Sequence, residues 1–361
     1  MYIAFIVGLF SVLSAYLSRY KEYKNGLTFS FILIFLFSAL RYKYGSDYPT
    51  YLASFQEFNR ALTPQILDFS RTMEPGWFVL CYIFKPFGFF ALTAFFALIN
   101  CIVFYRFIKI YLPINYYWIA VFIYVFSPNL LLLSLSGYRQ YLAIAIFLFS
   151  LQYIDQKKPF HYFFCITIAS FFHFSVVIMF PIYLLRFFTW KINRMNFVII
   201  LVFFISLFFF GEFLQPLLYS LLEGNFTKYT GYLYVSQTKA VFSSGLGFSF
   251  IIVLCILTLY YERIVDRRTA LLFKIAIIGF MFFPLNLFFD WMDRISFYFV
   301  PSRIIVFTSI FIYIKQPMFK IIFICALIIY TLYTYYAFMN DDLWKPSYGT
   351  YQTIFSSPEF Y

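Results

Sequence analysis

The chain has 361 residues, of which 63% are apolar and only 12% are charged, and its mean hydropathy is +0.82. Soluble globular domains do not reach these values. Apolar stretches of about 16–22 residues, close to the length that spans a bilayer, use up most of the chain and exclude a separate soluble domain. The formal net charge of +12 is dispersed between these stretches, which favours a signal for membrane topology over nucleic-acid binding.

The apolar stretches predict an all-α polytopic membrane protein with about ten transmembrane helices in a single domain, residues 1–361. Residues 1–3 lack the basic character of a cleavable signal peptide, so the first stretch is expected to remain as a span. Residues 76–87 are too short to cross the bilayer and predict a partial or interfacial helix. The predicted spans, in chain order, are 2–18, 26–40, 88–105, 116–134, 139–155, 196–211, 246–261, 270–289, 295–314 and 319–338.

Lysine and arginine residues gather in alternate loops, and the positive-inside rule places those loops in the cytoplasm. Both termini are then expected on the outside. Three segments are expected there as well, residues 41–75, 212–245 and 340–361, and they hold most of the acidic residues.

Residues 160–186 do not fit this alternation, because the basic loops at 157–158 and 186–194 both prefer the cytoplasm. A single crossing here would put the basic residues of 263–268 on the outside. We therefore predict a re-entrant hairpin of two half-helices that enters from the cytoplasm and turns near His173, since irregular backbone at membrane depth is tolerated where it lines a protein cavity. An ordinary span followed by one badly placed basic loop is the alternative.

The first group of charged residues follows the second predicted span, in residues 41–48. Anchoring at the bilayer surface accounts for an arginine and several tyrosines in such a place. A carboxylate needs a partner or a function there, so Asp47 is a candidate catalytic residue and Arg41 a candidate substrate ligand.

A second group contains Arg71 and Glu74, and Glu74 directly precedes Pro75. Proline is favoured in the first turn of a helix, so one interpretation is that the Glu74 carboxylate stabilises the helix dipole. The other interpretation makes Glu74 a catalytic carboxylate and Arg71 a substrate ligand.

The third group is Arg139 with Gln140, after Ser136 and Gly137, which offer a helix start. Backbone N–H groups at a helix N-terminus together with a guanidinium form an anion site, and arginine suits the two-pronged binding of a pyrophosphate. An arginine that only anchors the headgroup layer is the alternative.

His173 is one of only two histidines and lies within an apolar segment, at the predicted helix break. A lone histidine of this kind is often a hydrogen-bonded core residue. If His173 faces a pocket, it can orient an acceptor hydroxyl or act as a general base near neutral pH.

A last group contains Asp290, Asp293 and Arg294, whose spacing places them on one helix face, and Arg303, which lies deep within a predicted span. Ion pairing within the group is one explanation, but an arginine at that depth needs a pocket or a partner. Four arginines are expected to converge in one cavity that opens outward: Arg41, Arg139, Arg294 and Arg303.

Several motifs of cofactor and metal chemistry are missing from the sequence. There is no P-loop, dinucleotide-binding glycine pattern, histidine and cysteine metal spacing or nucleophile elbow, and Asp341 with Asp342 is too weak to predict a metal site. The five cysteines lie in apolar segments, which indicates buried thiols rather than disulfides. No cofactor or metal is expected.

These motifs, in this order, resemble those of the EpsG family of bacterial membrane proteins, which includes Wzy-type O-antigen and capsule polymerases. The resemblance covers residues 41 to about 300 and rests on five pieces: residues 41–51, 74–76, 136–143, 172–175 and 293–299.

The resemblance implies a glycosyltransferase-type polymerase of the bacterial inner membrane that joins undecaprenyl-pyrophosphate-linked oligosaccharides on the periplasmic or outer face. Its products would be O-antigen, capsule or exopolysaccharide, and its partners a chain-length regulator and a flippase of the same pathway. The catalytic residues would then be Asp47, Glu74 and His173. The substrate ligands would be Arg41, Arg71, Arg139, Gln140, Asp293, Arg294 and Arg303.

The sequence is also compatible with two other functions. A flippase for the same lipid-linked glycans would line a path through both leaflets with cationic residues, whereas here they concentrate on one side. A membrane-bound O-acyltransferase would place His173 at the centre and make the arginines incidental.

Overall fold

The computed structural model describes residues 2–58, 73–188, 195, 198–203, 205–206, 252–253, 256, 267–285 and 292–356. They belong to two compact units, one formed by Met1–Phe180 with Gln316–Tyr361 and the other by Pro181–Lys315. Within the described residues the chain is almost entirely helical, as the sequence predicts.

The first unit contains α1 Tyr2–Leu17, η1 Lys21–Tyr23, α2 Gly26–Ala39, β1 Arg41–Tyr42, α3 Tyr48–Glu57, α4 Pro75–Phe84, α5 Phe89–Tyr111, η3 Ile114–Tyr116, α6 Tyr117–Phe126, α7 Leu131–Ser134, α8 Tyr138–Asp155, α9 Pro159–Ser170, α15 Pro317–Asn340, α16 Lys345–Tyr348, β2 Gln352–Thr353 and η7 Ile354–Ser356. The 3-10 helix η4, Phe174–Arg186, runs from this unit into the second one. The second unit contains α12 Arg267–Leu285, α13 Met292–Ser296 and α14 Val300–Tyr313.

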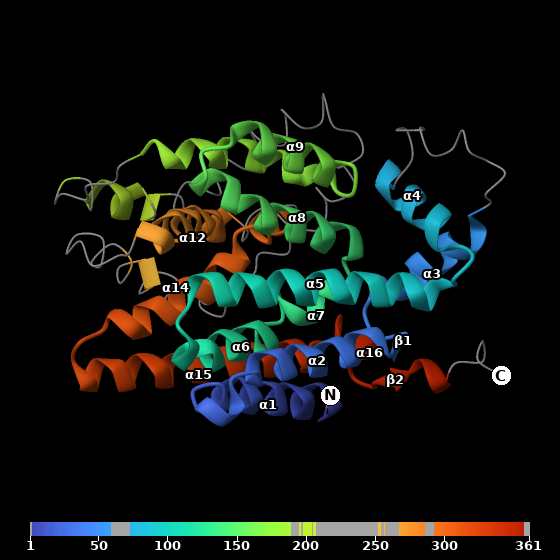
Figure 1. Cartoon of the computed structure of the whole chain (residues 1–361), viewed down its shortest axis with the longest axis horizontal. Coiled ribbons are helices and arrows are strands. Elements are labelled where there is room, and N and C mark those ends of the chain that lie inside the picture. The colour runs from blue at the N-terminus through green and yellow to red at the C-terminus, as the bar shows by residue number, and fades with distance from the viewer. Residues whose placement is uncertain are drawn as a thin grey trace. The chain divides into compact units, whose positions relative to one another are not determined.

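The helices of the first unit pack in a row, as Figure 1 shows. Helix α9 packs on α8, α8 on α5, α5 on α2 and α2 on α1, which also contacts α6. In the second unit, α12 packs against α13 and α14. The predicted interfacial segment 76–87 is the short helix α4.

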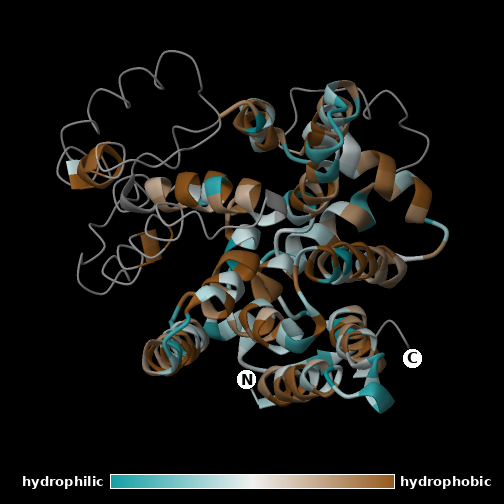
Figure 2. Cartoon of the chain, turned by 60° about the vertical axis from the view of Figure 1, so that its left-hand side comes forward, coloured by the Kyte–Doolittle hydropathy of each residue, from teal (hydrophilic) through white to brown (hydrophobic). Residues whose placement is uncertain are grey.

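Two of the described helices, α5 and α15, are long and apolar enough to cross a membrane. Hydrophobic residues, in brown, recur along the helices in Figure 2, and only 22% of the apolar window of α15 is buried within the protein. Large exposed apolar surfaces of this kind are unusual in soluble monomers. The other apolar helices have 10–17 residues, so the prediction of about ten spans goes beyond the lengths observed.

Two predicted spans are broken in the structure. Segment 116–134 forms α6 and α7 with a gap after Phe126, because Pro128 lacks an N–H group and disfavours helical backbone in the residue before it. Segment 295–314 is likewise divided between α13 and α14, and Pro301 lies in the first turn of α14. Hydropathy alone treats both segments as continuous.

The predicted hairpin near 160–186 is present as two helical arms. Helix α9 ends at Ser170, and η4 begins at Phe174, so the break lies at the predicted place. The Tyr162 hydroxyl donates to the Met179 carbonyl at 2.6 Å, which holds the start of one arm against the second. That the hairpin is re-entrant in the membrane, and that it enters from the cytoplasm, stays a prediction.

Several predicted segments lie wholly or partly outside the described residues: 196–211, 212–245, 246–261, 270–289 and parts of the external segments 41–75 and 340–361. The orientation of the termini and of the external segments therefore also stays a prediction.

Candidate functional site

Glu74 links two other residues that the sequence singles out. One carboxylate oxygen forms an ion pair with Arg139, and the other lies 3.2 Å from His173 Nδ1. The second oxygen also accepts the backbone N–H of Phe174 at 3.3 Å. The side chains are 21% exposed for Glu74, 17% for Arg139 and 13% for His173. Three segments that are far apart in the sequence thus form one partly buried charged cluster, the Arg139–Glu74–His173 cluster.

Each member of the Arg139–Glu74–His173 cluster lies where a helix begins or a hairpin turns. Glu74 precedes Pro75, the first residue of α4, and Arg139 lies in the first turn of α8. His173 lies in the turn between α9 and η4. The predicted helix start after Gly137 is therefore confirmed. The Glu74 side chain makes no capping hydrogen bond to α4, so its carboxylate is committed to the charged cluster instead.

Gly76 permits the close approach of α4 to the hairpin turn. Its N–H donates to the Phe171 carbonyl at 2.8 Å. A Cβ atom at this position would lie 2.6 Å from that oxygen and 2.6 Å from the ring of Phe172. A side chain there would push the turn that carries His173 away from Glu74.

We expect Gly76→Ala to destabilise the protein by about 1–3 kcal/mol, because it overpacks this contact. Thermal unfolding in detergent measures the change, and Gly137→Ala is the matched control. The nearest atom to a Cβ at Gly137, in the ring of Tyr141, is at an ordinary 3.4 Å. Equal unfolding temperatures for the two variants would contradict the close approach.

Aromatic packing fixes the orientation of Arg139. Its Nε donates to the Tyr51 hydroxyl at 3.3 Å, and its guanidinium carbon lies 5.8 Å from the centre of that ring. The Tyr51 ring lies 4.7 Å from the rings of both Trp77 and Tyr138, within the buried cluster where α3, α4, α5 and α8 meet. Arg139 is therefore held both by Tyr51, whose ring packs on two others, and by the Glu74 carboxylate.

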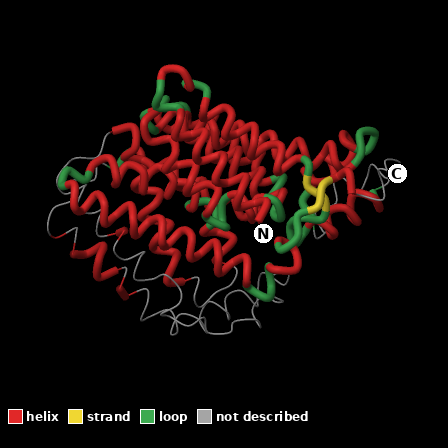
Figure 3. Tube along the Cα trace, turned by 90° about the horizontal axis from the view of Figure 1, so that it is seen from below, coloured by secondary structure: helices red, strands yellow, loops and turns green. Residues whose placement is uncertain are grey.

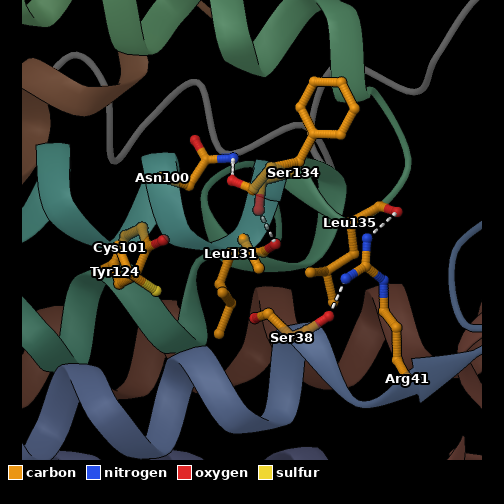
Figure 4. A pocket seen from close by; sticks show the side chains of 10 residues that line it. Ser38, Arg41, Asn100, Cys101, Tyr124, Leu131, Ser134 and Leu135 are labelled. Atoms are coloured by element: carbon orange, nitrogen blue, oxygen red, sulfur yellow. Dashed lines mark hydrogen bonds between the residues drawn. The ribbon is translucent and has the colours of Figure 1, made fainter. Parts of the chain in front are cut away.

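Arg41 is 1% exposed and contacts the protein's own backbone. It donates to the carbonyls of Ser38 and Leu135 and lies over the ring of Tyr138 at 5.3 Å. Arg41 and Asn100 are among the residues that line a small cavity of about 10 Å³ (Figure 4), which is room for about one water molecule. Arg41 thus joins the end of α2 to the segment before α8. Its role as a substrate ligand stays a prediction.

Asp47 is exposed and immediately precedes α3. The Ser46 hydroxyl donates to its carboxylate at 3.2 Å, and the Asp47 carbonyl accepts the N–H of Tyr51 at 3.0 Å. The turn before it needs glycine at position 45, where φ is +125° and a Cβ would lie 2.6 Å from the Leu135 carbonyl. Asp47 therefore lies one helical turn from the tyrosine that orients Arg139.

The roles of the remaining predicted ligands stay predictions. Gln140 is buried at the next position of α8, about 100° around the helix from Arg139. Arg71 lies outside the described residues. The other three belong to the second unit: Asp293, Arg294 and Arg303.

In the second unit, the guanidinium carbon of Arg303 lies 4.8 Å from the centre of the Phe280 ring. Asp293 and Arg294 are neighbours on the short helix α13. Asp290 lies outside the described residues, so the face it was predicted to share is not tested. The convergence of the four arginines in one cavity also stays a prediction. Across the described ranges, no three His, Cys, Asp or Glu side chains are grouped to hold a metal ion.

The structure adds Tyr348, which the sequence does not single out. Its hydroxyl lies 2.6 Å from the Ser136 hydroxyl, and the Ser136 oxygen accepts the Ser46 N–H at 2.7 Å. The chain contains 34 tyrosines, and nothing in the local pattern around residue 348 distinguishes this one. The two serines lie within the predicted motifs, but the motifs carry no sign of their common partner.

Within the described residues, apolar helices and a partly buried charged cluster define an all-α protein with an ionisable site. The chain belongs to the EpsG family, whose family model matches residues 24–353. This match confirms the resemblance and associates the chain with polysaccharide biosynthesis at the membrane. It extends beyond the motifs to β2, so it includes Tyr348. No curated protein and no solved structure matches the chain.

Proposed function

We propose that the protein is a polysaccharide polymerase that joins undecaprenyl-pyrophosphate-linked oligosaccharide repeat units on the periplasmic or outer face of the inner membrane. The observation that carries the proposal is the Arg139–Glu74–His173 cluster, in a family associated with polysaccharide biosynthesis. It combines a guanidinium for an anionic leaving group with two groups that can accept a proton.

The chemistry requires little beyond these groups. An acceptor hydroxyl attacks the anomeric carbon of the donor glycan, a new glycosidic bond forms, and the bond from that carbon to the lipid pyrophosphate breaks. The pyrophosphate takes the electron pair and leaves on its lipid, and the hydroxyl proton passes to a base. Arg139 stabilises the departing charge, because a guanidinium binds phosphate oxygens with two parallel hydrogen bonds.

Glu74 contacts Arg139 directly, and His173 contacts Glu74, so the cluster holds two groups that can accept a proton. A pyrophosphate that binds Arg139 competes with Glu74 for the guanidinium. The other oxygen of Glu74 lies against His173 and the Phe174 N–H, so the carboxylate has a second anchor when Arg139 turns to the substrate. We infer that Glu74 or the Glu74–His173 pair accepts the proton, with Asp47 as the other candidate base.

The finer assignments are part of the same proposal. Besides Arg139, the proposed ligands for the two lipid-linked substrates are Arg41, Arg71, Gln140, Asp293, Arg294 and Arg303. The protein would be multi-pass, with its site facing outward, and would work with a flippase and a chain-length regulator.

Deleting the gene is expected to leave single repeat units on the acceptor lipid, because the units are made and exported but not joined. Gel separation of the extracted glycans measures their length. Loss of all displayed glycan would indicate a flippase instead. Full-length chains that lack an ester would indicate an acyltransferase, and each of these results overturns the polymerase.

A further inference from the structure

The C-terminal segment 341–356 returns to the loop at residues 41–48 and pairs with it. Figure 3 shows the two short strands, in yellow, side by side. Strand β2 pairs antiparallel with β1, with Arg41 opposite Thr353. The Gly45 N–H donates to the Ser347 carbonyl at 3.2 Å. The segment that the sequence treats as an external tail is therefore built into the loop that carries Asp47.

Tyr348 is fully buried in this segment. It is 0% exposed, and its ring lies 5.3 Å from that of Tyr44 and 5.1 Å from that of Phe338. Burial raises the pKa of the Tyr348 phenol above its usual range, and the negative charge of Asp47 acts in the same direction. The hydroxyl therefore keeps its proton at neutral pH and remains a hydrogen-bond donor.

The donors and acceptors around Tyr348 form one directed chain. The Tyr348 hydroxyl donates to the Leu132 carbonyl at 3.1 Å, so it accepts the proton of Ser136 Oγ at 2.6 Å. Ser136 Oγ in turn accepts the N–H of Ser46 at 2.7 Å and lies 3.0 Å from Ser46 Oγ. The Ser46 hydroxyl donates its one proton to the Asp47 carboxylate at 3.2 Å, so Ser46 joins the chain through its N–H and not through its Oγ. Hydrogen bonds in such a chain strengthen one another in a buried setting.

This chain joins the two loops that carry candidate site residues. Ser136 lies three residues before Arg139, immediately ahead of α8, and Ser46 is next to Asp47. A shift of either loop displaces a charged group of the site. A misplacement of about 1 Å can cost on the order of a hundredfold in rate, because catalytic groups must meet the substrate in a narrow range of geometries.

We propose that Tyr348 is a positioning residue, which fixes the start of α8 and the Asp47 turn for the polymerisation proposed above. The inference rests on that proposed function. Tyr348 itself does not touch the substrate, because its side chain is enclosed by the protein.

The test is Tyr348→Phe, which removes one hydroxyl and keeps the ring. The matched control is Tyr351→Phe in the same segment. The Tyr351 hydroxyl donates to the Phe37 carbonyl at 2.7 Å, and its ring lies 5.2 Å from Tyr44. Both variants thus lose one hydrogen bond to a backbone carbonyl, but only Tyr348 bonds to Ser136.

Membranes that contain each full-length variant are supplied with the host's own lipid-linked repeat units, and the rate of joining is measured. We expect Tyr348→Phe to lower the rate by about tenfold or more and Tyr351→Phe by less than about twofold, at equal protein levels and unfolding temperatures. A Tyr348→Phe variant that works at the wild-type rate overturns the proposal. Equal losses of rate and stability in both variants overturn it as well.

Two further readouts separate positioning from general stability. Hydrogen exchange at the Ser46 amide is expected to speed up in Tyr348→Phe and to stay unchanged in Tyr351→Phe. Ser136→Ala combined with Tyr348→Phe is expected to lose little more activity than Ser136→Ala alone, since Ser136→Ala already breaks the bond between the two hydroxyls. Additive losses of activity in the double variant, or unchanged hydrogen exchange at the Ser46 amide in Tyr348→Phe, contradict the hydrogen-bond chain.

Ser136→Ala alone replaces Tyr348→Phe if the latter does not accumulate, because it also removes the acceptor of the Ser46 N–H. A wild-type rate in Ser136→Ala then overturns the proposal. The proposed function fails on a different result, namely a gene deletion that leaves either no displayed glycan or full-length glycan chains.

Discussion

Arg139→Ala is expected to abolish polymerisation while the protein still inserts into the membrane at the wild-type level. The change removes the guanidinium that would stabilise the departing pyrophosphate and leaves Glu74 with the His173 and Phe174 contacts. Removal of one electrostatic donor to a developing charge costs roughly a hundredfold to a thousandfold in rate. The measurement is the length of glycan chains in cells that carry the variant as the only copy of the gene.

Arg139→Lys is expected to restore little, because lysine keeps the charge but loses the two parallel hydrogen bonds. Arg19→Ala is the matched control. Arg19 also lies over a tyrosine, at 4.9 Å from the ring of Tyr16, but it is exposed and lies outside the cluster. Long chains in Arg139→Ala cells would show that Arg139 is only a headgroup anchor.

Hydropathy and charge predict where the helices lie. The breaks between them depend on particular residues, namely the basic loops around His173 and the proline at position 128. The turn at His173 was predictable because two flanking basic loops cannot both be cytoplasmic if the segment crosses once. The break after Phe126 was equally open to prediction, since Pro128 is visible in the sequence. An apolar average over 116–134 hides it, because proline does not interrupt a hydropathy plot as it interrupts a helix.

The candidate site was predictable only one residue at a time. Glu74, Arg139 and His173 each had a local explanation, as a helix-dipole carboxylate, a headgroup anchor and a core histidine. The choice between local and shared roles depends on contacts across 65 residues of chain for Glu74 and Arg139. Such pairing is set by how α4, α8 and the hairpin pack, which a residue pattern does not encode.

Tyr348 shows the same limit more strongly. It is 212 residues from Ser136 in sequence, yet their hydroxyls lie 2.6 Å apart. The tail appears polar and aromatic in the sequence, which is typical of an external or interfacial segment. Its return to β1 depends on backbone pairing at Arg41 and Tyr42. Because backbone groups are the same in every residue, the side-chain sequence carries no sign of this pairing.

Glu74→Gln is expected to lower polymerisation by about a hundredfold or more, because the amide cannot accept the proton of the acceptor hydroxyl and carries no charge for Arg139. The side chain keeps its size, so the Gly76 contact with Phe171 is retained. Glu57→Gln is the matched control, since Glu57 is an exposed carboxylate at the end of α3. The rate of joining lipid-linked repeat units in membranes measures both variants.

His173→Ala separates the two roles that Glu74 can have. If Glu74 and His173 act as one proton acceptor, a variant that combines Glu74→Gln with His173→Ala is expected to lose little more activity than Glu74→Gln alone. The losses of activity at residues that work as a unit do not add. Binding of the lipid-linked donor should persist in His173→Ala, since the Arg139 guanidinium remains. If Glu74 only neutralises Arg139, Glu74→Gln should weaken the ion pair and little else. A rate within a few-fold of wild type would then assign the proton to Asp47, the other carboxylate next to this site.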